Sequence, residues 1–379
     1  MQKKLTALAI ATAFSTPVFA DSTTTVYGVL DAGYGDVSKT VTSNLGVDAP
    51  KTGQTAIAFS QATSSRLGFL NKEDLGNGMT MALKVETGIG SNPASAAKYG
   101  TTSAVATNGT TIDATSLGNR ELNLLLNLGE GTSIKAGYGS TPVRDFTFAY
   151  DAALGGNLVG NMVTMDPATS SNRATTVDVI HQFGPVKGTV GVLRNTDHTE
   201  GKTDTQVANG YQVAVQYAQD ALSVAFAYQS AKTTTVATTA PFAATADVTT
   251  KVGILAASYD FGVAKAFGEY ANVKIDDAVN PLAAGTGKRS FGSLGVDVPF
   301  DAVMGFAQYS FGSQNQVTTA NTASNSRNMS GYTVGAKYTM SKTTWAYASL
   351  GETKLKEAAG ASDSGIKISQ YALGLVHTF

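Results

Sequence analysis

The chain of 379 residues has no cysteine, one tryptophan and only 15% charged residues. Without cysteine it cannot hold a disulfide scaffold, a cysteine-based zinc site, a redox CxxC pair or a thiol nucleophile. Its 27 basic and 28 acidic residues nearly cancel, so it lacks the strongly basic surface of nucleic-acid-binding proteins. Its 15 Tyr and 16 Phe residues argue against disorder, because disordered chains are poor in aromatic residues.

Long apolar runs are also missing. The run over residues 5–14 follows Lys3 and Lys4 and precedes small residues ending at Ala20, the pattern of a secretory signal peptide. We expect cleavage after Ala20, which leaves residues 21–379 as one folded domain. Because the run is shorter than the roughly 20 residues of a spanning helix, the exported chain is expected to be a secreted soluble protein or an outer-membrane β-barrel.

Apolar and polar residues alternate with a period of two along most of the chain. Residues 79–86, 211–217 and 370–379 show the pattern clearly. Successive side chains of a strand point to opposite faces, so this period predicts strands with one apolar face and one polar or small-residue face.

Short and long connections alternate between these strands. Seven short turns are expected at 71–77, 129–131, 184–187, 219–220, 260–262, 299–301 and 340–342. Eight long loops, rich in Thr, Ser, Ala, Asn and Gly, are expected at 37–54, 91–118, 141–173, 196–209, 232–249, 275–288, 314–329 and 355–366. Sixteen strands follow, with both chain ends on the short-turn side. A soluble sandwich or solenoid has no reason for this rhythm, whereas a transmembrane barrel has short periplasmic turns and long outer loops. The prediction is an all-β, antiparallel, 16-stranded transmembrane barrel, closed because an unpaired strand edge does not survive in hydrocarbon.

Sixteen strands leave a water-filled channel inside the barrel. The polar face would line this water and need no packing partner, so we expect a fold without a dry core. A bare tube of this width would discriminate little among solutes. The third long loop, 141–173, carries aromatic and charged residues, and we expect it to fold into the lumen and narrow it. The alternative is an exposed loop that stabilises a neighbouring subunit.

Three segments resemble the general porins of Gram-negative bacteria, in the branch of betaproteobacteria and neisseriae. Thr25–Gly33 is similar to the opening strand of that branch. Ser64–Phe69, followed by Lys72–Gly78, is close to its SRLGF…EDLGGG signature. Gln370–Phe379 resembles its last strand, with His two positions before a terminal Phe.

This resemblance implies a homotrimer in outer-membrane lipid and lipopolysaccharide, without cofactor or metal, with wall arginines that face acids of the third loop. By position, Arg66 matches the arginine of SRLGF and Arg173 the arginine where the third loop rejoins the wall. Arg120 matches a basic residue that opens the fourth strand, although strict alternation would put it on the side of Leu122 and Leu124. It therefore needs a bulge or loop position. Further members of the expected pore constriction are Lys84, Glu86, Lys135, Asp145, Asp151 and Asp166. The terminal Phe379 resembles the signal read by the outer-membrane assembly machinery.

The residues show no enzyme chemistry. No HExxH, GxSxG or dinucleotide motif is present, and His181, His198 and His377 are the only histidines. We expect a passive diffusion channel for small hydrophilic solutes and ions. Three alternatives stay open: a substrate-selective porin, with saturable current; a surface adhesion or structural barrel, with no conductance; and an outer-membrane enzyme, with Ser, His and an acid at one rim. Ion preference also stays open, because Gly137-Tyr138-Gly139 stands where many relatives of the branch carry an arginine.

Overall fold

The computed structural model describes residues 22–42, 47–89, 117–170, 172–197, 206–236, 245–277, 286–317, 324–357 and 365–379. The expected signal peptide (1–20) and His198 lie outside these residues. The strands are β1 (Ser22–Thr42), β2 (Thr52–Phe59), β3 (Arg66–Gly76), β4 (Met79–Gly88), β5 (Glu121–Gly129), β6 (Thr132–Ser140), β7 (Arg173–Phe183), β8 (Val186–Asp197), β9 (Gln206–Gln219), β10 (Leu222–Val236), β11 (Thr245–Asp260), β12 (Lys265–Asp277), β13 (Gly287–Phe300), β14 (Val303–Val317), β15 (Ser324–Thr339), β16 (Thr344–Glu357) and β17 (Gly365–Thr378).

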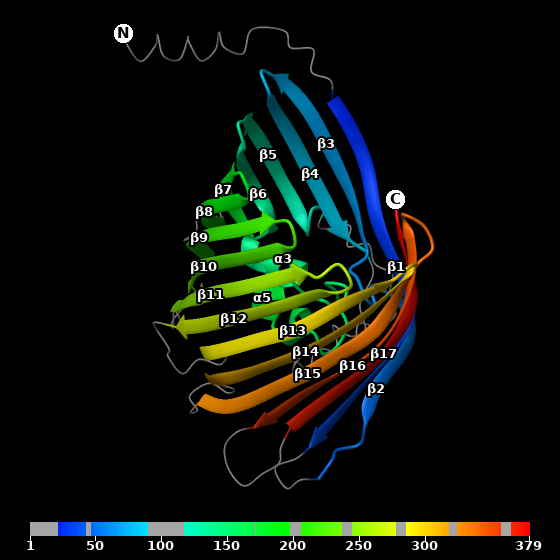
Figure 1. The fold of residues 1–379 in the computed structure, drawn as a ribbon. Helices are drawn as coiled ribbons and strands as arrows, with labels where there is room; N and C mark the ends of the chain where they lie inside the picture. Colours follow the sequence, from blue (N-terminus) through cyan, green and yellow to red (C-terminus); the bar gives the residue numbers. More distant parts are fainter. Residues whose placement is uncertain are drawn as a thin grey trace, which may run out of the picture.

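These segments form one antiparallel sheet that closes into a barrel, because β1 pairs with β17 (Figure 1). β2 and β3 occupy a single position in the wall. The first part of β1, Ser22–Val29, pairs with β3, and its continuation Ala32–Lys39 pairs with β2. Seventeen segments therefore fill sixteen positions around the barrel, which confirms the predicted strand number.

Seven short turns and eight longer connections alternate along the chain, as predicted. Asn77-Gly78 and Glu130-Gly131 have positive φ at both residues, the requirement of the tight turn that suits twisted antiparallel strands. The strands are longer than expected. The region 71–77, expected as a turn, is strand up to Gly76, and β10 runs to Val236 although 232–249 was expected as a loop. Antiparallel pairing satisfies the backbone of Thr-rich segments without any apolar alternation.

The outer face of the barrel is apolar. Exposed large side chains recur at every second position of many strands, for example Leu122 and Leu124, Val190 and Val192, and Leu373 and Leu375. A continuous exposed apolar surface of this kind marks a surface that is covered by another apolar phase. No helix in the described ranges is both long and apolar enough to cross a bilayer.

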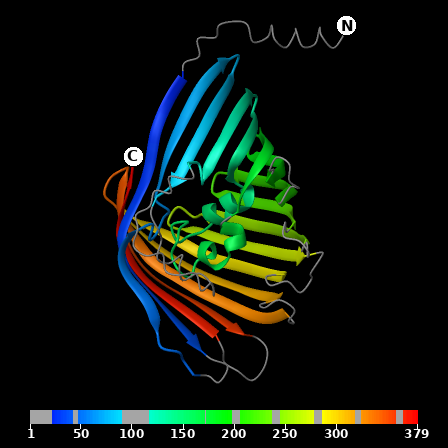
Figure 2. The ribbon, with the colours of Figure 1, turned by 180° about the vertical axis from the view of Figure 1, so that it is seen from behind.

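Three short helices lie in the connection between β6 and β7: α3 (Pro142–Ala149), α4 (Met162–Met165) and α5 (Pro167–Ser170). We call residues 141–170 the helical segment. Proline in its first turn suits the start of α3, and the Asn161 side chain caps α4 by accepting a hydrogen bond from the Thr164 N–H at 2.9 Å. α3 contacts β9, β10 and β11, and α4 contacts β13, so the helices lie against the concave side of the sheet (Figure 2).

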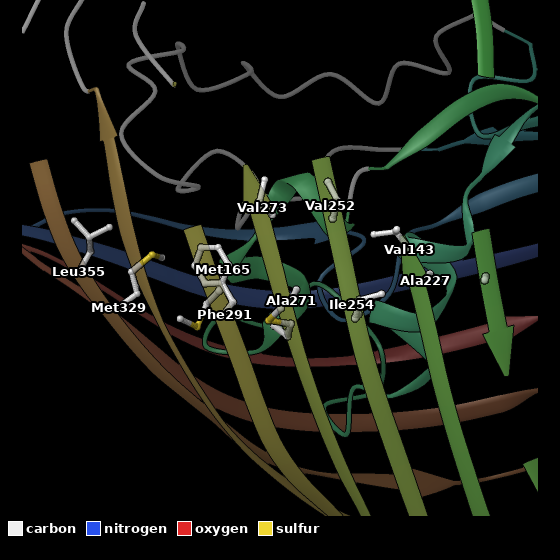
Figure 3. Close-up of a cluster of buried hydrophobic side chains, with 12 residues drawn as sticks. Val143, Met165, Ala227, Val252, Ile254, Ala271, Val273, Phe291, Met329 and Leu355 are labelled. Carbon is white, nitrogen blue, oxygen red and sulfur yellow. The ribbon is translucent and has the colours of Figure 1, made fainter. Parts of the chain in front are cut away.

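The expectation of a fold without a dry core is wrong. Apolar side chains of the helical segment pack against apolar side chains on the inner face of the wall (Figure 3). Ile254 on β11 is 1% exposed inside this cluster, whereas the next residue, Leu255, is 55% exposed on the outer face. Strand β11 is thus apolar on both faces at this point. The cluster contains Val143, Met162, Met165, Ala214, Ala227, Val252, Ile254, Ala271, Val273, Phe291, Met329 and Leu355.

Candidate functional site

A cavity of about 620 Å³ lies inside the barrel beside the helical segment. We call it the large cavity. Strands β3, β4 and β5 and the helical segment supply one side of its lining, and β12, β13 and β15 supply further charged groups. Its charged lining residues are Arg66, Lys84, Glu86, Arg120, Glu121, Arg144, Asp145, Asp151, Lys265, Asp297 and Lys337.

Two arginines share the Glu86 carboxylate. Arg120 Nε lies 2.7 Å from Glu86 Oε1, and Arg66 Nε lies 3.6 Å from Oε2. Tyr27 donates its hydroxyl hydrogen to the same Oε2 at 2.9 Å. Glu86 is only 6% exposed, and charge-assisted contacts of this kind compensate the cost of removing a carboxylate from water. The group carries two positive charges and one negative charge.

Arg120 takes the irregular position that the alternation pattern required. It lies immediately before β5, outside the regular strand, and its backbone N–H donates to the Glu86 carbonyl oxygen at 3.1 Å. A residue there does not follow the alternation of the strand, so its side chain reaches Glu86 although Leu122 and Leu124 face outward.

Arg144 and Arg173 add two further guanidinium groups. Arg144 stacks over the Phe148 ring at 4.1 Å and donates to Ser140 Oγ at 3.3 Å. Burial and the positive charges of Arg173 and Arg120 lower the pKa of Arg144 to about 10, so it stays charged at neutral pH. The Nε atoms of Arg144 and Arg173 are buried and have no hydrogen-bond partner among the described residues.

Glu121 is held by neutral donors. Its Oε1 accepts hydrogen bonds from the backbone N–H and the hydroxyl of Ser140, at 3.1 and 2.8 Å, and its Oε2 accepts from Asn123 at 2.8 Å. Four guanidinium groups therefore lie around two buried carboxylates, Glu86 and Glu121. Asp145 and Lys84 also line the large cavity and balance each other, so this side has a net positive charge.

Asp151 lines the large cavity from the helical segment. Its buried carboxylate accepts hydrogen bonds from the Ala153 N–H at 2.9 Å, from Gln308 at 3.1 Å and from Asn161 at 3.3 Å. Burial raises the pKa of Asp151 to about 6. Gln308 in turn accepts the Ala152 N–H at 2.9 Å, which ties the helical segment to β14.

Three of the expected residues do not line the large cavity. Lys135 forms an ion pair with Asp178 at 3.2 Å and lines a second cavity of about 200 Å³ between α3 and the wall. Asp166 is fully buried and lies 3.7 Å from Arg289 Nη1. Arg173 is the first residue of β7 and lies near Arg120 and Arg144 without lining the cavity. At the chain end, Phe379 exchanges two backbone hydrogen bonds with Gly28, at 3.0 and 3.2 Å.

Several lining residues of the large cavity were not predicted from the sequence. Lys337 could have been found from alternation, because Tyr338 beside it faces outward and is half exposed. Arg144 carried no such signal, since a loop residue has no strand parity. The other missed lining residues with charged side chains are Glu121, Lys265 and Asp297. No group of three or more potential metal-ligating side chains occurs within the described ranges.

Comparisons with known proteins identify a family from the sequence and similar folds among solved structures. The family model for Gram-negative porins matches residues 6–358. No curated protein matches the chain in sequence. Among solved structures, the anion-selective porin from Comamonas acidovorans is 20% identical, with a TM-score of 0.65 over 95% of this chain and 100% of that one. OmpT of Vibrio cholerae in its trimer form is 15% identical, with a TM-score of 0.62 over 94% and 99%. Salmonella typhi OmpF in complex with daunomycin is 13% identical, with a TM-score of 0.59 over 94% and 97%.

Proposed function

Since the chain belongs to the Gram-negative porin family and is a multi-pass β-barrel channel of the outer membrane for passive diffusion of solutes, we propose that it is a general porin with a preference for anions. In this proposal the helical segment narrows the lumen, and the large cavity is the constriction that permeating solutes cross. Small hydrophilic solutes and ions are the expected cargo, and no enzymatic step is involved.

The charge distribution at the constriction carries the anion preference. Three guanidinium groups in the cavity lining, from Arg66, Arg120 and Arg144, and that of Arg173 beside them lie around two buried carboxylates, Glu86 and Glu121. A ring of net positive charge lowers the energy of an anion and raises that of a cation within the pore. The likeness to the anion-selective Comamonas porin supports the same direction.

Assembly follows the family resemblance. We propose a homotrimer, supported by the trimer form of Vibrio cholerae OmpT and by the apolar outer face of the barrel. The Comamonas likeness supports a place in the betaproteobacterial branch. The same proposal includes residues 1–20 as a signal peptide, outer-membrane lipid and lipopolysaccharide around the barrel, and Phe379 as the residue read by the assembly machinery.

The test is the reversal potential of single channels in a planar bilayer under a KCl gradient. Wild type is expected to open in steps of three and to prefer chloride. Arg66→Ala removes one charge from the constriction. At about 7 Å in water a unit charge shifts the energy of a monovalent ion by roughly 0.6 kcal/mol, and the shift has opposite sign for an anion and a cation, so the anion-to-cation permeability ratio should fall about sevenfold. The control is Lys342→Ala, which removes the same charge from an exposed turn outside the cavity lining.

Each other outcome overturns a defined part of the proposal. An Arg66→Ala channel with the wild-type ratio would remove Arg66 from the constriction. Cation preference in wild type would refute the proposed net positive charge at the constriction. Current that saturates with one solute would indicate a substrate-selective porin, and folded protein without current would indicate an adhesion or structural barrel.

A further inference from the structure

The wall is interrupted between β2 and β3 at Ser60–Ser65, which we call the strand break. In a regular wall strand, alternate side chains would face outward and be exposed. Here Ser60, Gln61, Ala62 and Ser65 are all buried, at 0–4% exposure, so the strand break turns into the barrel. Figure 1 shows β2 and β3 as separate arrows that both lie beside β1.

Asp31 on β1 organises this inward turn. Its Oδ2 accepts the backbone N–H groups of Ala62 at 2.6 Å and Thr63 at 2.8 Å, and its Oδ1 accepts the Tyr347 hydroxyl at 2.8 Å. The Asp31 backbone carbonyl also accepts the Ser60 N–H at 2.8 Å. The side chain is fully buried and has no cationic partner among the described residues, so these three donors stabilise its charge.

The strand break holds the helical segment from the other side. The Ala62 carbonyl oxygen accepts the Asn157 N–H at 2.7 Å, and the Asn157 side chain donates to the Ser60 carbonyl oxygen at 3.2 Å and to Ser64 Oγ at 3.3 Å. Gly156 passes so close that an added Cβ would lie 1.8 Å from the Ala62 oxygen, so the contact requires glycine. A chain of direct hydrogen bonds therefore runs from Asp31 through the strand break to the helical segment.

The same strand break also positions the constriction arginine. Arg66 is the first residue after it, and Arg66 Nη1 donates to the Ser64 carbonyl oxygen at 2.9 Å. Thr63 and Ser64 line the large cavity beside Arg66. The buried Asp31 carboxylate thus holds the strand break, and the strand break in turn holds both Arg66 and the helical segment.

We propose that Asp31 is a positioning residue that sets the width of the constriction, with Tyr347 as its supporting donor. The inference rests on the proposed constriction at the large cavity. Asparagine replaces the carboxylate only in part: its carbonyl oxygen can accept the two backbone N–H groups that Asp31 Oδ2 accepts, but its NH2 group then faces the Tyr347 hydroxyl, and the negative charge is lost. Without the carboxylate the strand break and the helical segment are held less firmly, and the constriction samples additional conductance states.

The experiment compares single-channel currents of wild type, Asp31→Asn and Tyr347→Phe. The matched control is Asp36→Asn on the same strand. Its carboxylate accepts a hydrogen bond from Thr55 Oγ1, and within the described ranges it has no hydrogen bond to the strand break or to the helical segment. Asp31→Asn is expected to fold, as judged by heat-modifiable migration in detergent gels, but to spend about tenfold more time in substates, because a charge-assisted hydrogen bond is lost. Tyr347→Phe should show a smaller rise, and Asp36→Asn none.

A folded Asp31→Asn channel with wild-type substate occupancy and permeability ratio would overturn the proposal. If Asp31→Asn does not fold, the currents of Tyr347→Phe and Asn157→Ala test the proposal instead. Asn157→Ala removes the side-chain hydrogen bonds between the helical segment and the strand break and leaves Asp31 in place. Wild-type currents in both variants would overturn the proposal. Failure of the proposed anion preference is visible separately, in the wild-type reversal potential. Substates that increase in Asp31→Asn support the positioning role whatever ion the channel prefers.

Discussion

Buried carboxylates hold the interior of this barrel together, and Asp151 is one of those in the helical segment. Burial raises its pKa to about 6. Because this value lies above the ordinary 3.8, the folded state favours the protonated form. The stabilising contribution is complete below about pH 3.8 and is lost as the pH rises through about 6. Glu269, Asp297 and, through Asp297, Lys265 and Lys337 are the charged groups that interact with it.

We therefore expect Asp151→Asn to flatten the pH dependence of barrel stability between pH 4 and pH 7. Asparagine stays neutral, as the protonated carboxyl does. The measurement is the unfolding temperature by circular dichroism across this range, and wild type should lose more stability than the variant as the pH rises. Asp36→Asn serves as the control, since it removes a carboxylate outside this group of charges. Equal slopes in wild type and Asp151→Asn would contradict the assignment.

At the scale of the elements, adjacent residues of β11 lie in two different environments, the apolar cluster inside the barrel and the apolar surface outside it. Ile254 packs under the helical segment, and Leu255 faces outward. Ile254→Ala removes buried atoms and leaves a cavity, which costs about 2–4 kcal/mol of unfolding free energy. Leu255→Ala, the same kind of truncation one position along, should cost less, because a fluid apolar phase outside the barrel can fill the space and only the transfer free energy of the removed groups is lost. Urea unfolding of both variants in lipid vesicles checks the difference, and similar costs would contradict the dry inner wall.

Elements were predictable from sequence wherever a lipid phase and a polar interior act on opposite faces of one strand. That contrast imposes the period of two, so sixteen wall positions and seven short turns follow from it. Arg120 departs from this alternation, since strict alternation would put it on the outer face with Leu122 and Leu124. The departure predicted an irregular position, and Arg120 lies just before β5. Residues 252–256 are apolar or small on both faces, and alternation alone cannot distinguish a dry inner wall from a wet one there.

The strand break was not predictable, because its cause is not local. Residues 59–66 contain neither glycine nor proline, the strongest turn signals, and their Ser and Thr residues do not indicate that the chain turns inward. The turn depends on the Asp31 carboxylate about thirty residues earlier and on Tyr347 near the other chain end. Likewise α4 and α5, with four residues each, are too short to show a helical period. Arg66 and Arg120 could be named because they match positions of a family pattern, whereas Arg144, Lys265 and Asp297 became part of the cavity only through tertiary packing.

At the scale of the whole molecule, the helical segment divides the barrel interior into the apolar cluster and the large cavity. Because the same segment packs on the wall and lines the large cavity, changes to it should affect both stability and permeation. Replacing residues 144–170 by a short Gly-Ser linker should widen the channel and raise its conductance. It should also lower the unfolding temperature, because Val252, Ile254, Val273 and Phe291 would then contact water. Adding Val252→Thr and Ile254→Thr to this deletion should restore part of the lost stability while leaving conductance high, since a hydrated wall tolerates hydroxyl groups. The same two substitutions in the intact chain should destabilise it, because they bury hydroxyls under α3. A deletion variant as stable as wild type would mean that the helical segment rests on the wall without stabilising it, and the division of the interior would then have no energetic meaning.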